Sequence, residues 1–139
     1  MNKAVLLGIV AALDKEFGLS VYVNSVEQGA EYPCFLVAKL NGGMKRRLGN
    51  RYKMSNYYDI TYLTESDKPT MEQIDVEERL YRCLEFIEVD GSLAKETEIE
   101  CTTIDGVLHC FVSYNFFVKK QVVKEDAMEH ITLKTKLGE

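Results

Sequence analysis

The chain has 139 residues, of which 46% are hydrophobic and 28% charged, and this balance is typical of one soluble globular domain. A chain of this length buries enough surface to fold without a disulfide or a structural metal. Its formal net charge of −5 argues against general affinity for nucleic acid, because non-specific binding to DNA needs a basic surface.

A buried first helix is predicted over residues 3–17, ending at Gly18. Ten apolar residues in succession occupy positions 4–13, a length that suits a signal peptide but is too short for a membrane-spanning helix. Charged residues follow at once, without a typical cleavage site. Apolar side chains also recur along one face of a helix at Leu6, Ile9, Val10, Leu13 and Phe17. We therefore expect a packed helix rather than an export signal.

Three short strands are predicted next, over residues 19–26, 34–40 and 56–63. The second places Cys34, Leu36, Ala38 and Leu40 on one face, and the third does the same for Tyr58, Ile60 and Tyr62. The sequence Asn-Gly-Gly at 41–43 predicts a turn between them. Segment 44–53 carries five basic residues and no acidic one, which predicts a basic hairpin arm between two core strands. Its basic residues are Lys45, Arg46, Arg47, Arg51 and Lys53.

A second helix is predicted from Thr70 to about Glu88. Thr70 and Gln73 have the spacing of a capping box at its start. The side chains expected on its buried face are Val76, Leu80, Cys83, Leu84 and Ile87, and those on its outer face are Glu77, Glu78 and Glu85. The sequence Val-Asp-Gly-Ser-Leu at 89–93 then turns the chain.

Residues 97–118 predict a β-hairpin with a type I′ turn, because Asp105-Gly106 is a preferred pair for such turns. This register pairs Ile104 with Val107, Thr103 with Leu108, Cys101 with Cys110, Ile99 with Val112, Glu100 with Phe111 and Thr102 with His109. We interpret Cys101, Cys110 and the other two cysteines, Cys34 and Cys83, as reduced core thiols. A disulfide between Cys101 and Cys110 would need an oxidising compartment.

The last 21 residues, 119–139, are predicted to be an extension of a domain that spans 1–118. The sequence His-Ile-Thr-Leu-Lys-Thr-Lys-Leu at 130–137 alternates like a strand. We expect either a flexible tail or an arm that completes a neighbour's sheet. The predicted fold class is α+β, with two helices on one face of an antiparallel or mixed sheet and a long basic hairpin arm.

Motifs that carry chemistry are few. There is no phosphate loop, dinucleotide fingerprint, zinc-protease helix or nucleophile elbow in the sequence. His109 is expected on the outward face of its strand, opposite to Cys110, which argues against a Cys–His pair, and His130 lies in the extension. Glu96, Glu98 and Glu100 alternate along one strand face, which we interpret as a surface for positive charge, or a plain polar face, in preference to a cation site. We expect no enzyme activity, cofactor or metal.

Five short segments together resemble one known family. They are Gln28-Gly29, Pro33-Cys34-Phe35, Leu48-Gly49-Asn50-Arg51-Tyr52, Tyr58-Asp59-Ile60 and Asp105-Gly106-Val107. Their order and spacing resemble the tail terminator family of tailed phages, prophages and phage-tail-like bacteriocins of Gram-positive bacteria. The resemblance covers residues 3–118.

The resemblance implies an α+β subunit that assembles with itself into a ring, usually a hexamer, at the head-proximal end of the tail tube. The ring stops polymerisation of the tube protein, anchors the sheath protein in contractile tails, and offers a surface to a neck or connector protein where a head is present. It implies a virion protein made in the bacterial cytoplasm, with no membrane partner and no cofactor. DNA would meet it only by passage through the lumen.

A ring of identical subunits needs two different, complementary surfaces on each subunit. Our hypothesis is that the basic arm docks on the acidic surface of a neighbouring subunit or of the tube protein. That acidic surface comprises Glu96, Glu98 and Glu100, with the outer face of the second helix. Two other interpretations of the arm are a guard against edge-to-edge aggregation and a lining for a DNA-filled lumen. Two other functions stay open, a head–tail joining protein and a small cytoplasmic enzyme or ligand-binding domain.

Overall fold

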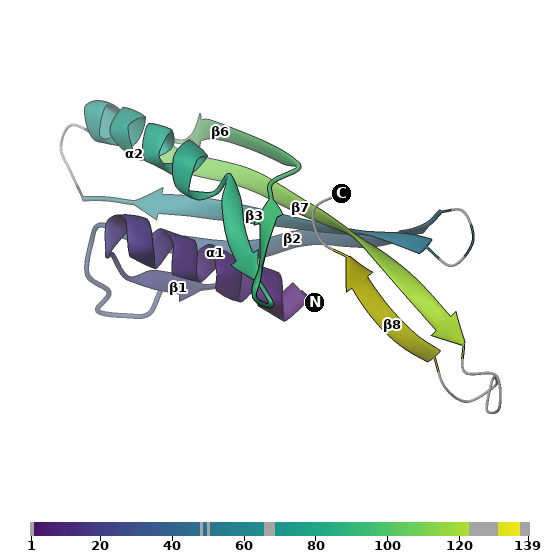
Figure 1. Ribbon diagram of the computed structural model, residues 1–139. Helices are drawn as coiled ribbons and strands as arrows, with labels where there is room; N and C mark the ends of the chain where they lie inside the picture. Colours follow the sequence, from purple (N-terminus) through teal and green to yellow (C-terminus); the bar gives the residue numbers. More distant parts are fainter. Residues whose placement is uncertain (1, 48, 50, 66–68, 123–130, 137–139) are drawn as a thin grey trace.

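The computed structural model of the protein describes residues 2–47, 49, 51–65, 69–122 and 131–136, with the backbone alone at residues 2, 69, 118–122 and 131–136. These residues form two helices, a large sheet of six strands and a small sheet of two, and Figure 1 shows how they are arranged. This arrangement confirms the α+β class. The elements in chain order are α1 (Asn2–Phe17), β1 (Val21–Val23), β2 (Cys34–Arg46), β3 (Arg51–Leu63), α2 (Pro69–Cys83), β4 (Phe86–Val89), β5 (Ser92–Lys95), β6 (Glu98–Ile104), β7 (Val107–Val122) and β8 (Ile131–Lys136).

The large sheet is mixed, with the strand order β1-β2-β3-β7-β6. β1 runs parallel to β2, and the other pairs are antiparallel. Strand β7 is long enough to hold two partners in line on one edge, since β6 pairs with its residues 107–113 and β8 with its residues 117–122. Its other edge is occupied by β3. The strands β2, β3 and β7 continue well beyond the helices, as Figure 1 shows.

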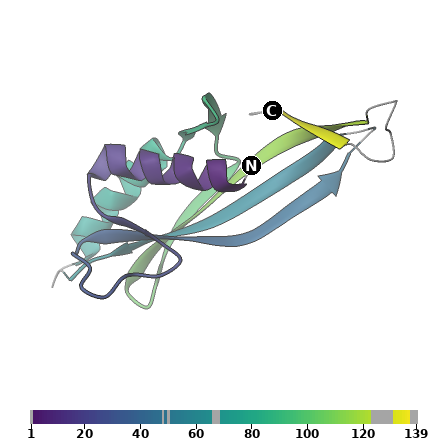
Figure 2. The same ribbon diagram turned by 90° about the horizontal axis from the view of Figure 1, so that it is seen from below.

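Both helices and the β4–β5 hairpin cover the same face of the large sheet, as the two views show together (Figures 1 and 2). The core between them is apolar and closely packed, as expected for a domain of this size. Its fully buried side chains include Val5, Ile9 and Leu13 from α1, Leu80 from α2, and Phe35, Val37, Ile60 and Cys110 from the sheet. The first helix is thus a core element, as predicted. No helix in the described part of the chain has the length and apolar content to cross a membrane.

The strand β2 packs on the core with the face opposite to Cys34, Leu36, Ala38 and Leu40, although Cys34 is itself fully buried. Phe35 and Val37 enter the core because they pair with Tyr62 and Ile60, which face it as predicted. Leu36 and Leu40 therefore lie on the outer face of the sheet, the face without helices, and Leu40 is 44% exposed. Apolar side chains occupy both faces of this strand, so alternation alone could not assign the core face.

The predicted turn at 41–43 is wrong, because β2 continues through it to Arg46. The register shifts between Lys39 and Gly42, so that one extra residue is absorbed as a β-bulge. The chain reverses only beyond Arg47, whose backbone N–H donates to the Arg51 carbonyl at 2.7 Å. Whether the long hairpin acts as an arm stays a prediction.

The second helix is shorter than predicted. It ends at Cys83, and residues 86–88 belong to β4, which pairs with β5 through a turn at Asp90 (φ 50°) and Gly91 (φ 81°). Ile87 is buried as expected, but it lies on a strand instead of a helix. A short apolar run fits the period of a helix and that of a strand, and the turn that follows favours the strand. A predicted strand also shortens, since only Val21–Val23 of 19–26 pairs.

The start of α2 differs from the predicted capping box. The helix begins at Pro69, a residue suited to the first helical position, so Thr70 lies within the first turn. The Gln73 amide instead donates to the Gly106 carbonyl at 3.0 Å and ties the helix to the β6–β7 turn. This contact links two elements that are distant in the sequence, which a local motif could not indicate.

Every predicted pair of the β6–β7 hairpin is confirmed, including Cys101 with Cys110. Asp105 (φ 51°) and Gly106 (φ 79°) have the positive φ values that a type I′ turn requires. All four cysteines are free. The predicted strand near the C-terminus is present as β8, which pairs with β7 of the same chain. His130 lies outside the described residues, and the domain boundary at 118 stays a prediction.

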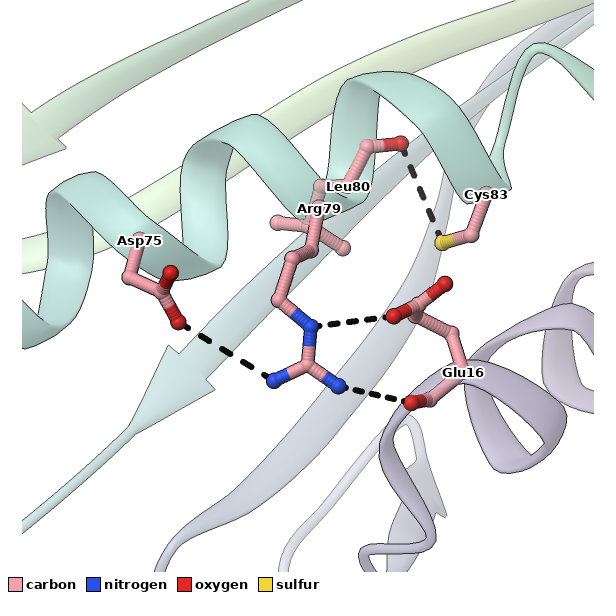
Figure 3. A network of polar contacts seen from close by, with 5 residues as sticks. All are labelled: Glu16, Asp75, Arg79, Leu80 and Cys83. Atoms are coloured by element: carbon pink, nitrogen blue, oxygen red, sulfur yellow. Dashed lines mark hydrogen bonds and ion pairs between the residues drawn. The ribbon is translucent and has the colours of Figure 1, made fainter.

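One polar network joins the two helices (Figure 3). The Arg79 guanidinium of α2 makes an ion pair with Glu16 at 3.0 Å and donates to the Glu16 backbone carbonyl at 2.7 Å. It also covers the ring of Phe17 at 4.2 Å, a cation–π arrangement. The end of α1 is thereby fixed against α2.

Candidate assembly interface

The five predicted basic residues lie together at the far end of the β2–β3 hairpin, away from the helices (Figure 1). We call them the basic end: Lys45, Arg46, Arg47, Arg51 and Lys53. All but Lys53, which is half-buried, are exposed. Lys45 pairs directly with Lys53 across the two strands, an arrangement of like charges that destabilises a sheet.

The basic end presents charge on both faces of the sheet. Lys53 pairs with Phe117 on β7 and faces outward with Lys45, whereas Met54 pairs with the buried Phe116 on the helix side. The Arg51 guanidinium lies 4.8 Å from the centre of the Phe117 ring. Within the described residues, none of the five makes an ion pair. Their charge is therefore available to an acidic partner.

Two of the three predicted acidic residues lie together on the outer face. Glu98 and Glu100 on β6 are exposed and pair with Ser113 and Phe111. They line a cleft of about 160 Å³, and in the described part of the chain neither has an ion pair. We call this the acidic cleft and define it by Leu40, Tyr57, Glu98, Glu100, Phe111 and Ser113.

Glu96 lies apart from this cleft. It precedes β6 and is half-buried, and its backbone N–H donates to the Glu85 carbonyl at 2.9 Å. Burial, and then the nearby Glu85 carboxylate, raise the pKa of the Glu96 side chain. The regular alternation that would align it with Glu98 and Glu100 starts only at Glu98, where the strand begins.

A histidine cluster beside the cleft was not predicted. His109 Nδ1 lies 3.1 Å from both carboxylate oxygens of Asp59 and 3.1 Å from Thr61 Oγ1. A catalytic relay needs one partner on each ring nitrogen, whereas here both partners share Nδ1. The contacts instead fix the imidazole, which stacks on Phe111 with centroids 6.0 Å apart. The cluster thus supports one wall of the acidic cleft.

Sequence reasoning missed this cluster because it depends on the pairing of β3 with β7. Thr61 lies directly opposite His109 in that pairing, and Asp59 lies opposite Phe111. The two strands are about 50 residues apart in the chain, as the separation of 50 positions between Asp59 and His109 shows. Turn signals in the sequence indicate the register of two strands joined by a hairpin, but not the register of strands that are distant in the chain.

A second hollow lies between α1 and the β4–β5 hairpin, with a volume of about 440 Å³. Gly8, Ala11, Phe86 and Leu93 contribute to its lining, together with Cys83. Burial, and then the nearby Glu16 carboxylate, raise the pKa of Cys83 to about 12, so the thiol is protonated at neutral pH. A protonated thiol is a poor nucleophile. No group of three or more His, Cys, Asp or Glu side chains suited to a metal occurs in the described ranges.

The comparisons with known proteins assign the chain to a class and then to a family. A family model described as "Phage tail terminator protein" matches residues 4–126. The class is therefore that of structural proteins of the phage tail. Because the match covers most of the chain, the protein belongs to the phage tail terminator family. No curated protein matches it with significance.

Proposed function

We propose that the protein ends growth of the tail tube by forming a ring, a hexamer, on its head-proximal end. The observation that carries this proposal is the family match over residues 4–126. In the proposal the subunit is made in the bacterial cytoplasm and becomes part of the virion or of a headless tail-like particle. The bound ring blocks addition of further tube subunits.

The distribution of charge supports a ring built from head-to-tail contacts. Such contacts require two different surfaces on each subunit, because one surface paired with itself gives only a dimer. The basic end and the acidic cleft are two such surfaces of opposite sign, on different parts of the sheet. In the proposal the basic end docks on a neighbouring subunit. Complementary charge then selects the partner and fixes the register.

The remaining partners follow from the same position on the tail. The tube protein meets one side of the ring, the sheath protein attaches in a contractile tail, and a neck or connector protein binds the other side where a head is present. DNA passes through the lumen. A head–tail joining protein of similar size is the alternative function.

The test is electron microscopy of particles from a producer strain that lacks this gene, with the complemented strain as control. We expect tail tubes of uncontrolled length without a collar. Tails of normal length that fail to carry heads would replace the proposal by the joining function. Normal particles would contradict both.

A further inference from the structure

The acidic cleft combines the features that recognise a guanidinium group. We propose that it binds an arginine side chain, Arg46 or Arg47, from the basic end of a second copy of this chain. The inference rests on the proposed ring and names the contact that would close it.

Aromatic and acidic groups lie on the same small cleft. Tyr57, which is 39% exposed, and Phe111 line it together with Glu98 and Glu100. A planar guanidinium stacks on an aromatic ring and donates two hydrogen bonds to a carboxylate at once. The cleft volume of 160 Å³ corresponds to roughly five waters at about 30 Å³ each, which is room for a guanidinium. Leu40 adds apolar surface for the methylene stem.

The same chain cannot supply this arginine. The acidic cleft ends at Ser113 on β7, whereas Lys53 of the basic end pairs with Phe117 on the same strand. Four residues of strand separate these positions by roughly 13 Å. Arg46 pairs with Tyr52, in the alternate set that faces the helix side with Met44 and Met54. Both surfaces are thus held apart by one rigid sheet, so the partner must be another molecule.

A second copy is the partner that the charges favour. Exposed charges of both signs lack ion pairs in the described part of this single chain, and a head-to-tail contact pairs them. The contact also relieves the repulsion between Lys45 and Lys53 by bringing negative charge to that end. An arginine is favoured over a lysine, because a planar guanidinium can stack on an aromatic ring and donate paired hydrogen bonds to a carboxylate at the same time, whereas an ammonium cannot.

The experiment measures the oligomeric mass of the purified full-length protein by native mass spectrometry and by light scattering over a concentration series. Three variants are compared with the wild type: E98R/E100R, R46E/R47E and the combination of all four changes. The control matched to E98R/E100R is E27R/E31R, which makes the same change of charge at two exposed positions between β1 and β2, outside both proposed surfaces. Circular dichroism verifies that each variant is folded.

We expect each double reversal to weaken the ring at least about tenfold and the four-fold combination to restore it. The variants R46K and R47K, tested singly, identify the arginine, and Y57A weakens the ring by removing one wall. A ring that persists in E98R/E100R, or a combination without rescue, overturns the inference. A ring of E98R/E100R that stays intact but no longer binds tube ends also overturns the inference, because the cleft would then bind the tube protein. Normal tails in the deletion strain, together with rescue of the ring, would reject tube capping but support this contact.

Discussion

Arg79 shows how a single residue can join two helices. Its guanidinium contacts the side chain and the backbone of Glu16 and covers the ring of Phe17. The side chains of the Arg79–Glu16 pair are each 31% exposed, so solvent screens part of the attraction. The hydrogen bond to the Glu16 backbone carbonyl and the contact with the Phe17 ring add to this screened attraction. Arg79 therefore contributes more than an ordinary surface ion pair.

We predict that R79A lowers the free energy of unfolding by about 1–2 kcal/mol, measured by urea denaturation. R79K should recover only part of this loss, because an ammonium cannot make the forked contacts. The matched control is D75N, since Asp75 is 70% exposed and lies 4.0 Å from Arg79. Equal losses in R79A and D75N would contradict the account.

Tyr114 is the second residue whose role can be measured. Its hydroxyl donates to the Leu84 carbonyl at 2.5 Å within the core. We predict that Y114F costs about 1–3 kcal/mol at neutral pH, because the buried carbonyl loses its donor. Urea denaturation of the wild type and the variant measures this difference, and an unchanged midpoint would argue against it.

The same side chain predicts a dependence on alkaline pH. Burial, followed by the nearby Glu96, raises the pKa of Tyr114 above the value of about 10 that it has when unfolded. Above pH 10 the unfolded chain releases this proton while the folded chain retains it, so stability falls as pH rises. The stability of Y114F should fall less steeply between pH 10 and 11. Parallel slopes for the two proteins would show that Tyr114 does not contribute.

At the scale of elements, turn chemistry decided how much the sequence could predict. Asp105-Gly106 fixed the register of β6 and β7 because a two-residue turn leaves one pairing. Asn41-Gly42-Gly43 carries a similar signal but forms a bulge within β2, since Gly also suits bulges. The acidic cleft could not be predicted in full, because Leu40 and Tyr57 join Phe111 only through the pairings of β2, β3 and β7. Long-range pairings leave no local pattern in one sequence.

The packing of α1 on β4 depends on a glycine. A Cβ at Gly8 would lie 2.5 Å from the Glu88 carbonyl oxygen, closer than real Cβ atoms approach a backbone. We predict that G8A costs about 1–3 kcal/mol by forcing helix and hairpin apart. Urea denaturation gives the loss, and hydrogen exchange in β4 and β5 should increase. The matched control is G43A, where nothing lies within 4 Å and a change within about 0.5 kcal/mol is expected. Equal effects at the two sites would contradict the role of close approach.

At the scale of the whole molecule, the fold separates stability from assembly. Helices and core occupy one face of the sheet, while the acidic cleft lies on the other face and the basic end beyond the helices. Surface charges of this kind contribute little to stability in a single chain. Reversal of Arg46 and Arg47 should therefore leave the monomer folded, with a thermal midpoint close to that of the wild type. A large fall in that midpoint would show that the basic end is part of the folded core.

The central claim is that contact through the basic end is needed to stop tail growth. The most direct measurement is the distribution of tail-tube lengths, by electron microscopy, in a deletion strain complemented with R46E/R47E. The strains complemented with the wild type and with E27R/E31R, a charge reversal outside both proposed surfaces, are the controls. We predict tubes of uncontrolled length from R46E/R47E and normal lengths from both controls. Tubes of normal length from R46E/R47E would contradict the claim.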